Sequence, residues 1–143
     1  MTEALARVNV LAIENRLRQL PQVGMPTDHF VSDGMYCRRL LMKARVATVG
    51  RVHKLEHFFV VALGEILVSG DENRRFISGS VIISPPGTKR AVVAIQPSAL
   101  LTFHRISDMP NWKTATLEEI EDYISEIDPE SMYGVGNTLK VLT

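Results

Sequence analysis

Cysteine is nearly absent from this chain of 143 residues, which has only Cys37. A single cysteine excludes an internal disulfide, so we expect packing alone to hold the core and a reducing, cytoplasmic setting to suit the protein. Cys37 also lacks a CxxC partner and a neighbouring histidine, which argues against a nucleophilic thiol.

An excess of charge is also missing, because 16 Lys and Arg balance 16 Asp and Glu. This balance argues against general binding of nucleic acid or of a membrane surface, although it permits a local basic pocket. No apolar run approaches the roughly 18 residues of a membrane helix. The early charges Glu3 and Arg7 argue against a signal peptide.

Common catalytic motifs are missing as well. The sequence contains no Walker loop, no G-x-S-x-G elbow and no H-E-x-x-H helix. Any catalysis would therefore fall to imidazole groups or to a metal-bound water.

The length and the 45% of hydrophobic residues suit one structural domain with a sizeable core. We divide it into an N-terminal helix (1–22), a β domain (30–107) and a C-terminal helix with a tail (108–143). Residues 3–19 have apolar side chains at helical spacing. The tail after the second helix is expected to be either extended and docked, or mobile.

Residues 34–106 consist of short apolar runs separated by Gly, Pro and Asn turn signals. Six or more short strands without intervening helices predict an antiparallel sandwich or barrel. A helix is predicted from residue 116 to about 127, because Thr116 and Glu119 have the spacing of a capping box and Pro129 follows.

Two histidines, His53 and His57, precede the apolar run Phe58–Val61. On a helix their spacing would place both on one face, but the following run favours a strand, along which four residues span roughly 13 Å. A shared site therefore requires the chain to turn within residues 54–56.

Residues 51–64 resemble the first motif of the cupin superfamily, which reads His-x-His, three or four residues, Glu, six residues, Gly. Arg51 stands at the position of the first His, and His53 at the position of the second. His57 stands at the Glu position, with Gly64 six residues beyond.

Residues 79–90 resemble the second motif, which reads Gly, five residues, Pro-x-Gly, two residues, His. Gly79, Pro85 and Gly87 match, and Arg90 replaces the histidine. The resemblance implies a mainly β, single-domain cupin-type β-sandwich or jelly-roll barrel with an N-terminal and a C-terminal α-helix.

A further resemblance, to small cupin-like proteins of tailed bacteriophages, covers about residues 30–128. It rests on HKLEH (53–57), PGTKR (86–90), TFH (102–104) and LEEIE (117–121). It implies a phage accessory protein acting in the host cytoplasm.

The altered motifs leave a reduced set of metal ligands. Arginine has no lone pair to offer a metal, so Arg51 and Arg90 cannot be ligands. His53, His57 and His104 are the candidate ligands, and three histidines with an open position suit one divalent Zn, Fe, Ni or Mn ion. No matching carboxylate is evident unless Glu56 turns inward.

The same region can instead bind a small anionic molecule, since guanidinium groups match phosphate or carboxylate by paired hydrogen bonds. The candidate ligand-binding residues are Arg51, His53, His57, Lys89, Arg90 and His104. We interpret His29 as an ordinary loop residue. The pairs Arg38-Arg39 and Arg74-Arg75 are interpreted as solvated charges, because adjacent strand residues point to opposite faces.

We expect a binder of a small anionic ligand, for example one that sequesters a host nucleotide defence signal. The alternatives are a metal-dependent cupin enzyme of isomerase, epimerase or dioxygenase type, and a virion or assembly component. We also expect a homodimer or a higher oligomer, with residues 3–19 offering an apolar stripe and residues 34–43 lying at a sheet edge that needs cover.

Overall fold

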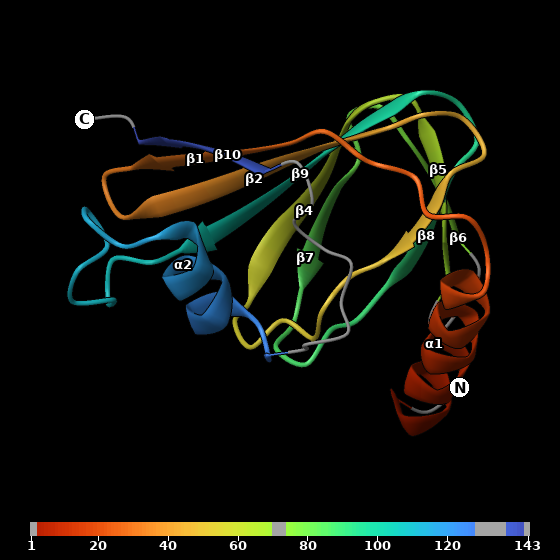
Figure 1. Cartoon of the computed structure of the whole chain (residues 1–143), viewed down its shortest axis with the longest axis horizontal. Helices are drawn as coiled ribbons and strands as arrows, with labels where there is room; N and C mark the ends of the chain where they lie inside the picture. The colour runs from red at the N-terminus through yellow and green to blue at the C-terminus, as the bar shows by residue number, and fades with distance from the viewer. Residues whose placement is uncertain (1–2, 70–73, 128–136, 142–143) are drawn as a thin grey trace.

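Two β-sheets pack face to face in the computed structural model, with one helix before the first strand and a second helix before the last strand (Figure 1). The structure describes residues 3–69, 74–127 and 137–141. The mainly β sandwich with N- and C-terminal helices that we predicted is confirmed.

The larger sheet has the order β10-β1-β2-β9-β4-β7, and the smaller has the order β3-β8-β5-β6. All neighbouring pairs are antiparallel except β1 and β10, which are parallel. The strands are β1 (Thr27–Ser32), β2 (Met35–Met42), β3 (Ala47–Val49), β4 (His57–Leu63), β5 (Glu65–Ser69), β6 (Arg74–Ile77), β7 (Val81–Ser84), β8 (Ala91–Ala94), β9 (Ser98–Arg105) and β10 (Asn137–Val141).

The core lies between the sheets because the strands alternate inward and outward side chains. Val61 and Ile66 are fully buried, and Leu100 packs with them. Burying such an aliphatic side chain contributes about 1.5–3 kcal/mol relative to leaving it exposed.

Gly64 joins β4 to β5 with a φ of 91°, a conformation that favours glycine. A Cβ at this position would overlap the carbonyl oxygen of Pro97 and the side chain of Ser98. The glycine that closes the first motif is therefore required by a close approach of backbone to backbone.

The N-terminal helix α1 (Glu3–Arg18) packs against β3 and β8. Val10 is buried there, and Glu14 forms an ion pair with Lys89. No helix among the described residues is long and apolar enough to span a bilayer.

The second helix, α2 (Leu117–Ile124), begins with the predicted capping box: Glu119 N–H donates to Thr116 Oγ1, and Thr116 N–H donates to Glu119 Oε1. The helix ends at Ile124, earlier than predicted. Ser125 is extended and pairs with His53 in an isolated β-bridge, so that strand-like contact replaces the last helical turn. The predicted stop at Pro129 lies outside the described residues.

The edges of the larger sheet differ from the prediction. Residues 34–43 do not form an edge, because β2 lies between β1 and β9. The sheet begins at Thr27, upstream of residue 30, and residues 137–141 from the tail join it as β10, which matches the extended and docked alternative.

Candidate metal and anion site

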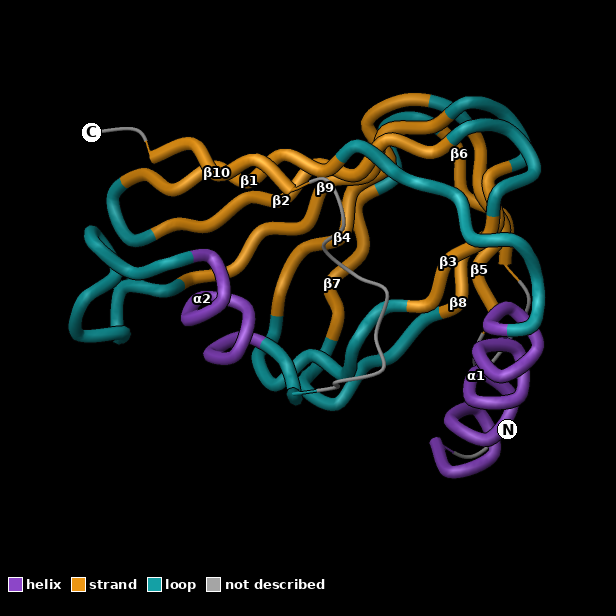
Figure 2. The backbone as a smooth tube through the Cα atoms, viewed as in Figure 1, coloured by secondary structure: helices purple, strands orange, loops and turns teal. Residues whose placement is uncertain are grey.

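The site lies where residues 51–56, the Pro-Gly loop and the end of α2 meet, and Figure 2 shows the end of α2 beside the loops at one end of the sandwich. His53 N–H donates to the Thr88 carbonyl, and Gly87 N–H donates to the His53 carbonyl. Lys54 N–H donates to the Ile124 carbonyl. These bonds fix residues 51–56 between the Pro-Gly loop and α2.

Three histidines converge at this point. His57 opens β4 and His104 lies near the end of β9, the strand next to it, where Phe58 pairs with Phe103. The chain bends at residues 54–55, and this bend brings the ring of His53 beside the rings of His57 and His104. The ring centroids of His53 and His57 lie 4.2 Å apart, which confirms the predicted turn.

The spacing of the rings suits one shared ion. One ligand nitrogen from each histidine lies within 4.8 Å of the others, and all three residues are buried. His53 Nδ1 and His104 Nε2 are 3.0 Å apart, whereas two nitrogens on one tetrahedral ion, at bonds of about 2.0–2.1 Å, lie about 3.3 Å apart. These two nitrogens would therefore need to move apart by only a few tenths of an ångström to share an ion.

All three imidazoles are held in the neutral form that can bind a metal. Burial lowers the pKa of His57 to about 4, although its hydrogen bond to Leu55 works the other way. Burial, with smaller contributions from His57 and Arg38, lowers the pKa of His104 to about 3. The pKa of His53 is lowered further still, by burial first and by Arg38 second.

The tautomer of His57 follows from its neighbour. Its Nδ1–H donates to the Leu55 carbonyl at 3.0 Å, so a neutral ring has its lone pair on Nε2. That Nε2 is buried and has no hydrogen-bond partner among the described residues. A lone pair in this position suits a metal ligand, because a bound ion would give Nε2 the interaction that the described residues do not provide.

A cavity of about 510 Å³ opens beside the histidines, between the two sheets and α1. This volume is in the usual range for small-ligand sites. Its walls mix apolar side chains such as Phe59 and Leu100 with arginines, and His53 and His57 are part of its lining.

The motif arginines lie as follows. Arg90 lines the cavity, donates to Ser84 Oγ at 2.6 Å and lies over the ring of Phe59. Burial lowers its pKa. Arg51 also lines the cavity, with its Nη1 3.6 Å from Asp122 of α2.

Lys89 is not among the residues that line this cavity. Its ammonium lies 3.2 Å from Glu14, and its side chain is 5% exposed. This basic residue of the PGTKR stretch therefore anchors α1.

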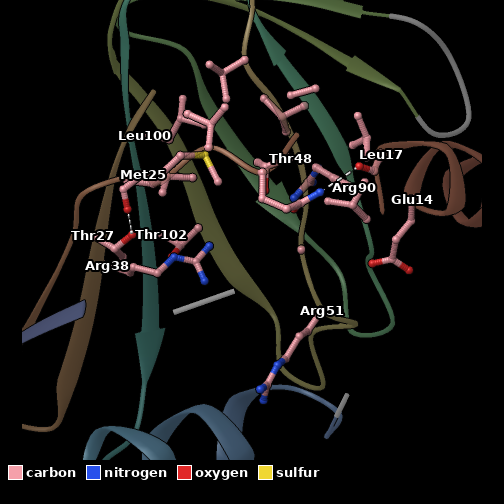
Figure 3. Close-up of a pocket in the computed structure, with 18 of the residues that line it drawn as sticks. Glu14, Leu17, Met25, Thr27, Arg38, Thr48, Arg51, Arg90, Leu100 and Thr102 are labelled. Atoms are coloured by element: carbon pink, nitrogen blue, oxygen red, sulfur yellow. Dashed lines mark hydrogen bonds between the residues drawn. The ribbon is translucent and has the colours of Figure 1, made fainter. Parts of the chain in front are cut away.

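The interpretation of Arg38 as a solvated charge is wrong, whereas Arg74 and Arg75 are exposed as predicted. Arg38 lines the cavity, beside Thr102 and across from Arg90 (Figure 3). Alternation places Arg38 and Arg39 on opposite faces of β2, but the sequence did not show which of these faces meets the core.

The interpretation of His29 as a loop residue is also wrong. His29 is fully buried in β1, and its Nδ1 forms a short hydrogen bond with the hydroxyl of Tyr36. Tyr36 in turn packs against His104. A polar layer therefore continues behind the three histidines.

The carboxylate near the site comes from α2. Glu56 is exposed and does not turn inward, whereas Glu121 is buried. Burial raises the pKa of Glu121, while Arg51 and Arg38 lower it. In the sequence, nothing marks Glu121 beyond its place on an acidic helix.

Comparison with protein-family models finds no match, and neither does comparison with curated proteins. The solved structures to which the chain is similar include three proteins at 11–16% identity. The first is a cupin superfamily protein from Desulfitobacterium hafniense, with a TM-score of 0.51 and 11% identity over 62% of this chain and 83% of that chain. The second is KdgF from a Halomonas species, with a TM-score of 0.52 and 16% identity over 62% of this chain and 85% of that chain. The third is a cupin 2 conserved barrel domain protein from Salinispora arenicola, with a TM-score of 0.51 and 16% identity over 64% of this chain and 86% of that chain.

Such low identities show similarity of fold and nothing finer. The histidines of this chain lie inside the sandwich, as does the cavity beside them. The chain has the fold of the cupin superfamily, with a three-histidine cluster that can hold a metal ion.

Proposed function

We propose that this protein is a small-molecule binder that holds one divalent metal ion on His53, His57 and His104 and binds an anionic ligand beside it. In this proposal Arg38 and Arg90 bind the anionic group. The metal, when present, supplies positive charge and open coordination positions for ligand oxygens.

One observation carries the proposal. Five buried side-chain polar atoms lack a hydrogen-bond partner among the described residues, and all belong to this end of the molecule: Arg51 Nε, His57 Nε2, Thr102 Oγ1, His104 Nδ1 and Glu121 Oε1. Each such atom costs about 1–3 kcal/mol. A metal ion would satisfy His57 Nε2, and the other four atoms show that this region has more polar groups than the described residues satisfy.

The charge of the cavity favours an anion. Arg90 and Arg38 both lower the pKa of His57, so both guanidinium groups lie near the histidine cluster. Partly dry surroundings strengthen a charge-assisted hydrogen bond to carboxylate or phosphate. Apolar walls leave room for a less polar remainder of the ligand.

A nucleotide signal is the finer form of this proposal. A nucleotide offers both phosphate for the arginines and a flat base for the apolar walls. Phage origin, action in the host cytoplasm and sequestration of a host defence signal rest on the sequence resemblance alone and stay predictions, as does the virion role.

A metal-dependent enzyme of the isomerase, epimerase or dioxygenase type is the second candidate. It is favoured by the number of ligands, because three histidines leave coordination positions open, as in catalytic metal sites.

Metal content tests the first half of the proposal. Protein purified without chelator should contain close to one equivalent of a divalent metal, measured by mass spectrometry of the elements. His57→Ala should lose it, because removing one of three ligands removes most of the affinity. Arg90→Ala should keep it, because a guanidinium is not a ligand.

Calorimetric titration tests the second half, with phosphate, nucleotides, cyclic nucleotides and small carboxylic acids as probes. Arg38→Ala or Arg90→Ala should weaken binding roughly 30-fold or more, the usual cost of removing a charge contact in a dry site, about 2–5 kcal/mol. Arg105→Ala is the matched control, because Arg105 lies on β9 but is exposed and pairs with Asp108.

The two candidates predict different results. Binding without turnover that is lost with Arg38 or Arg90 supports the binder. Stoichiometric metal with turnover of a probe would favour the enzyme, and the absence of both metal and ligand binding would reject the proposal.

A further inference from the structure

The outer face of the six-stranded sheet, which points away from the core, is unusually apolar. Its central row crosses five neighbouring strands, from β1 to β7, and the register pairs each member with the next. The row consists of Phe30, Cys37, Phe103, Phe58 and Ile83.

These side chains are well exposed: Phe58 is 49% exposed, Phe103 37% and Ile83 64%. The next row continues the surface with Leu101, Val60 and the exposed Val81, which are paired across β9, β4 and β7. We call these two rows the outer apolar face.

Charge on this face is neutralised within the chain. Arg39 and Asp28 stand at one end of the second row and form an ion pair, and Arg39 also lies over the ring of Phe30. Asp28 and Arg39 are the charged members of these two rows, and they neutralise each other.

Neither helix covers the outer apolar face. α1 packs against the smaller sheet, and α2 packs against inward-facing residues such as Val31 and Tyr36. An antiparallel sheet with one solvated face normally has polar side chains there. The sequence of these strands is therefore typical of a sheet covered on both sides.

We propose that the outer apolar face is the interface between two copies of this chain, packed sheet on sheet about a twofold axis. Such an interface pairs one patch with itself, so a neutral apolar face is complementary to its own copy. Aligned packing of two sheets interleaves the side chains of facing rows.

The available area is consistent with a dimer. A fully buried aromatic side chain contributes about 150–250 Å², so Phe58 and Phe103 each offer roughly 100 Å² or a little less. The two rows together offer several hundred Å² of exposed surface per copy. Contacts at the rim would bring the buried area toward the roughly 800 Å² per partner that stable dimers bury.

Sedimentation equilibrium of the full chain tests the proposal. Wild type should be a dimer at micromolar concentration. Phe58→Glu should raise the dissociation constant at least about 100-fold, because a central aromatic contact is lost in both copies and a charge must be buried. Ile83→Lys, at the edge strand, is a second variant in case the first folds poorly.

Leu11→Glu is the matched control. Leu11 is an exposed apolar residue on α1, and its replacement should leave the dimer intact. If dimers instead pair through the terminal helix, Leu11→Glu dissociates them and Phe58→Glu does not, and the proposal is wrong.

Cys37 provides a second readout, because it is the only cysteine and lies in the central row. Alkylation of Cys37 should slow as wild-type concentration rises through the dissociation constant, and it should be independent of concentration in Phe58→Glu. A wild type that is monomeric at high micromolar concentration would also overturn the proposal, and would leave the face to a different partner.

Discussion

At the scale of single residues, the site places neutral imidazoles next to positively charged guanidinium groups. Three imidazoles and two guanidinium groups share one buried region, and the imidazoles remain neutral because burial disfavours their charged form. Neutral imidazoles can bind a metal while the arginines keep their charge for an anion. In the proposed function, metal binding therefore falls to the histidines and anion binding to the arginines.

Acid should destabilise the metal-free protein. His57 and His104 have pKa values of about 4 and about 3 in the folded chain, against 6.5 as the ordinary value. Between pH 6.5 and about 4 the unfolded chain therefore binds more protons than the folded chain. The stability that these groups contribute is complete above pH 6.5, and it falls by roughly 1 kcal/mol per pH unit for each imidazole as the pH drops.

Urea unfolding of chelator-treated protein at several pH values measures this effect. His104→Gln should show a shallower dependence on pH, because one of the titrating groups is gone. A free energy of unfolding that stays flat from neutral pH down to about pH 5 would contradict the prediction.

At the scale of elements, the terminal helices do more than close the core. The end of α2 pairs with the segment around His53, and Asp122 of α2 holds Arg51. α1 contributes to the wall of the cavity and is anchored by the ion pair of Glu14 and Lys89. Helix docking and the shape of the site are therefore coupled.

Breaking the Glu14–Lys89 pair should be costly. The two side chains are 11% and 5% exposed, so Lys89→Met leaves a carboxylate largely buried, with Arg18 at 3.5 Å as its remaining ion-pair partner among the described residues. We expect a loss of about 2–3 kcal/mol in the free energy of unfolding, measured in urea.

Two comparisons make the test specific. The double variant Lys89→Met with Glu14→Leu should recover most of the loss, since no charge is then left buried. Arg75→Ala removes the exposed partner of Glu65 and should cost less than about 1 kcal/mol. Equal losses of unfolding free energy in Lys89→Met and Arg75→Ala would contradict the prediction, because burial of the Glu14–Lys89 pair would then make no difference.

At the scale of the whole molecule, bound metal would link the strands of the larger sheet. The three histidines come from β4, β9 and the loop before β4, so an ion bound to all of them joins segments far apart in the sequence. Binding to the folded state alone stabilises it in proportion to the logarithm of the ligand excess.

Metal should therefore raise the melting temperature. A free metal concentration of about 100 times its dissociation constant stabilises the fold by about 2.7 kcal/mol. We expect chelator to lower the melting temperature of wild type and of Arg105→Ala, and Zn²⁺ to restore it. His57→Ala should respond to neither, and an equal response in that variant would place the metal elsewhere.

The sequence by itself determined the local features of this protein. The apolar runs and turn signals predicted the β domain, and Thr116 with Glu119 predicted the start of α2. The strand length between His53 and His57 predicted the bend that brings them together. Each of these follows from residues close together in the chain, where spacing and backbone geometry suffice.

Only the tertiary structure decided which distant groups meet. Alternation in β2 was visible in the sequence, but strand pairing decided that Arg38 rather than Arg39 faces the cavity. Packing of α1 took Lys89 to Glu14, and packing of α2 buried Glu121. The physical reason is that a periodic pattern shows which side chains share a face, whereas the pairing of distant strands and the docking of helices determine what that face meets.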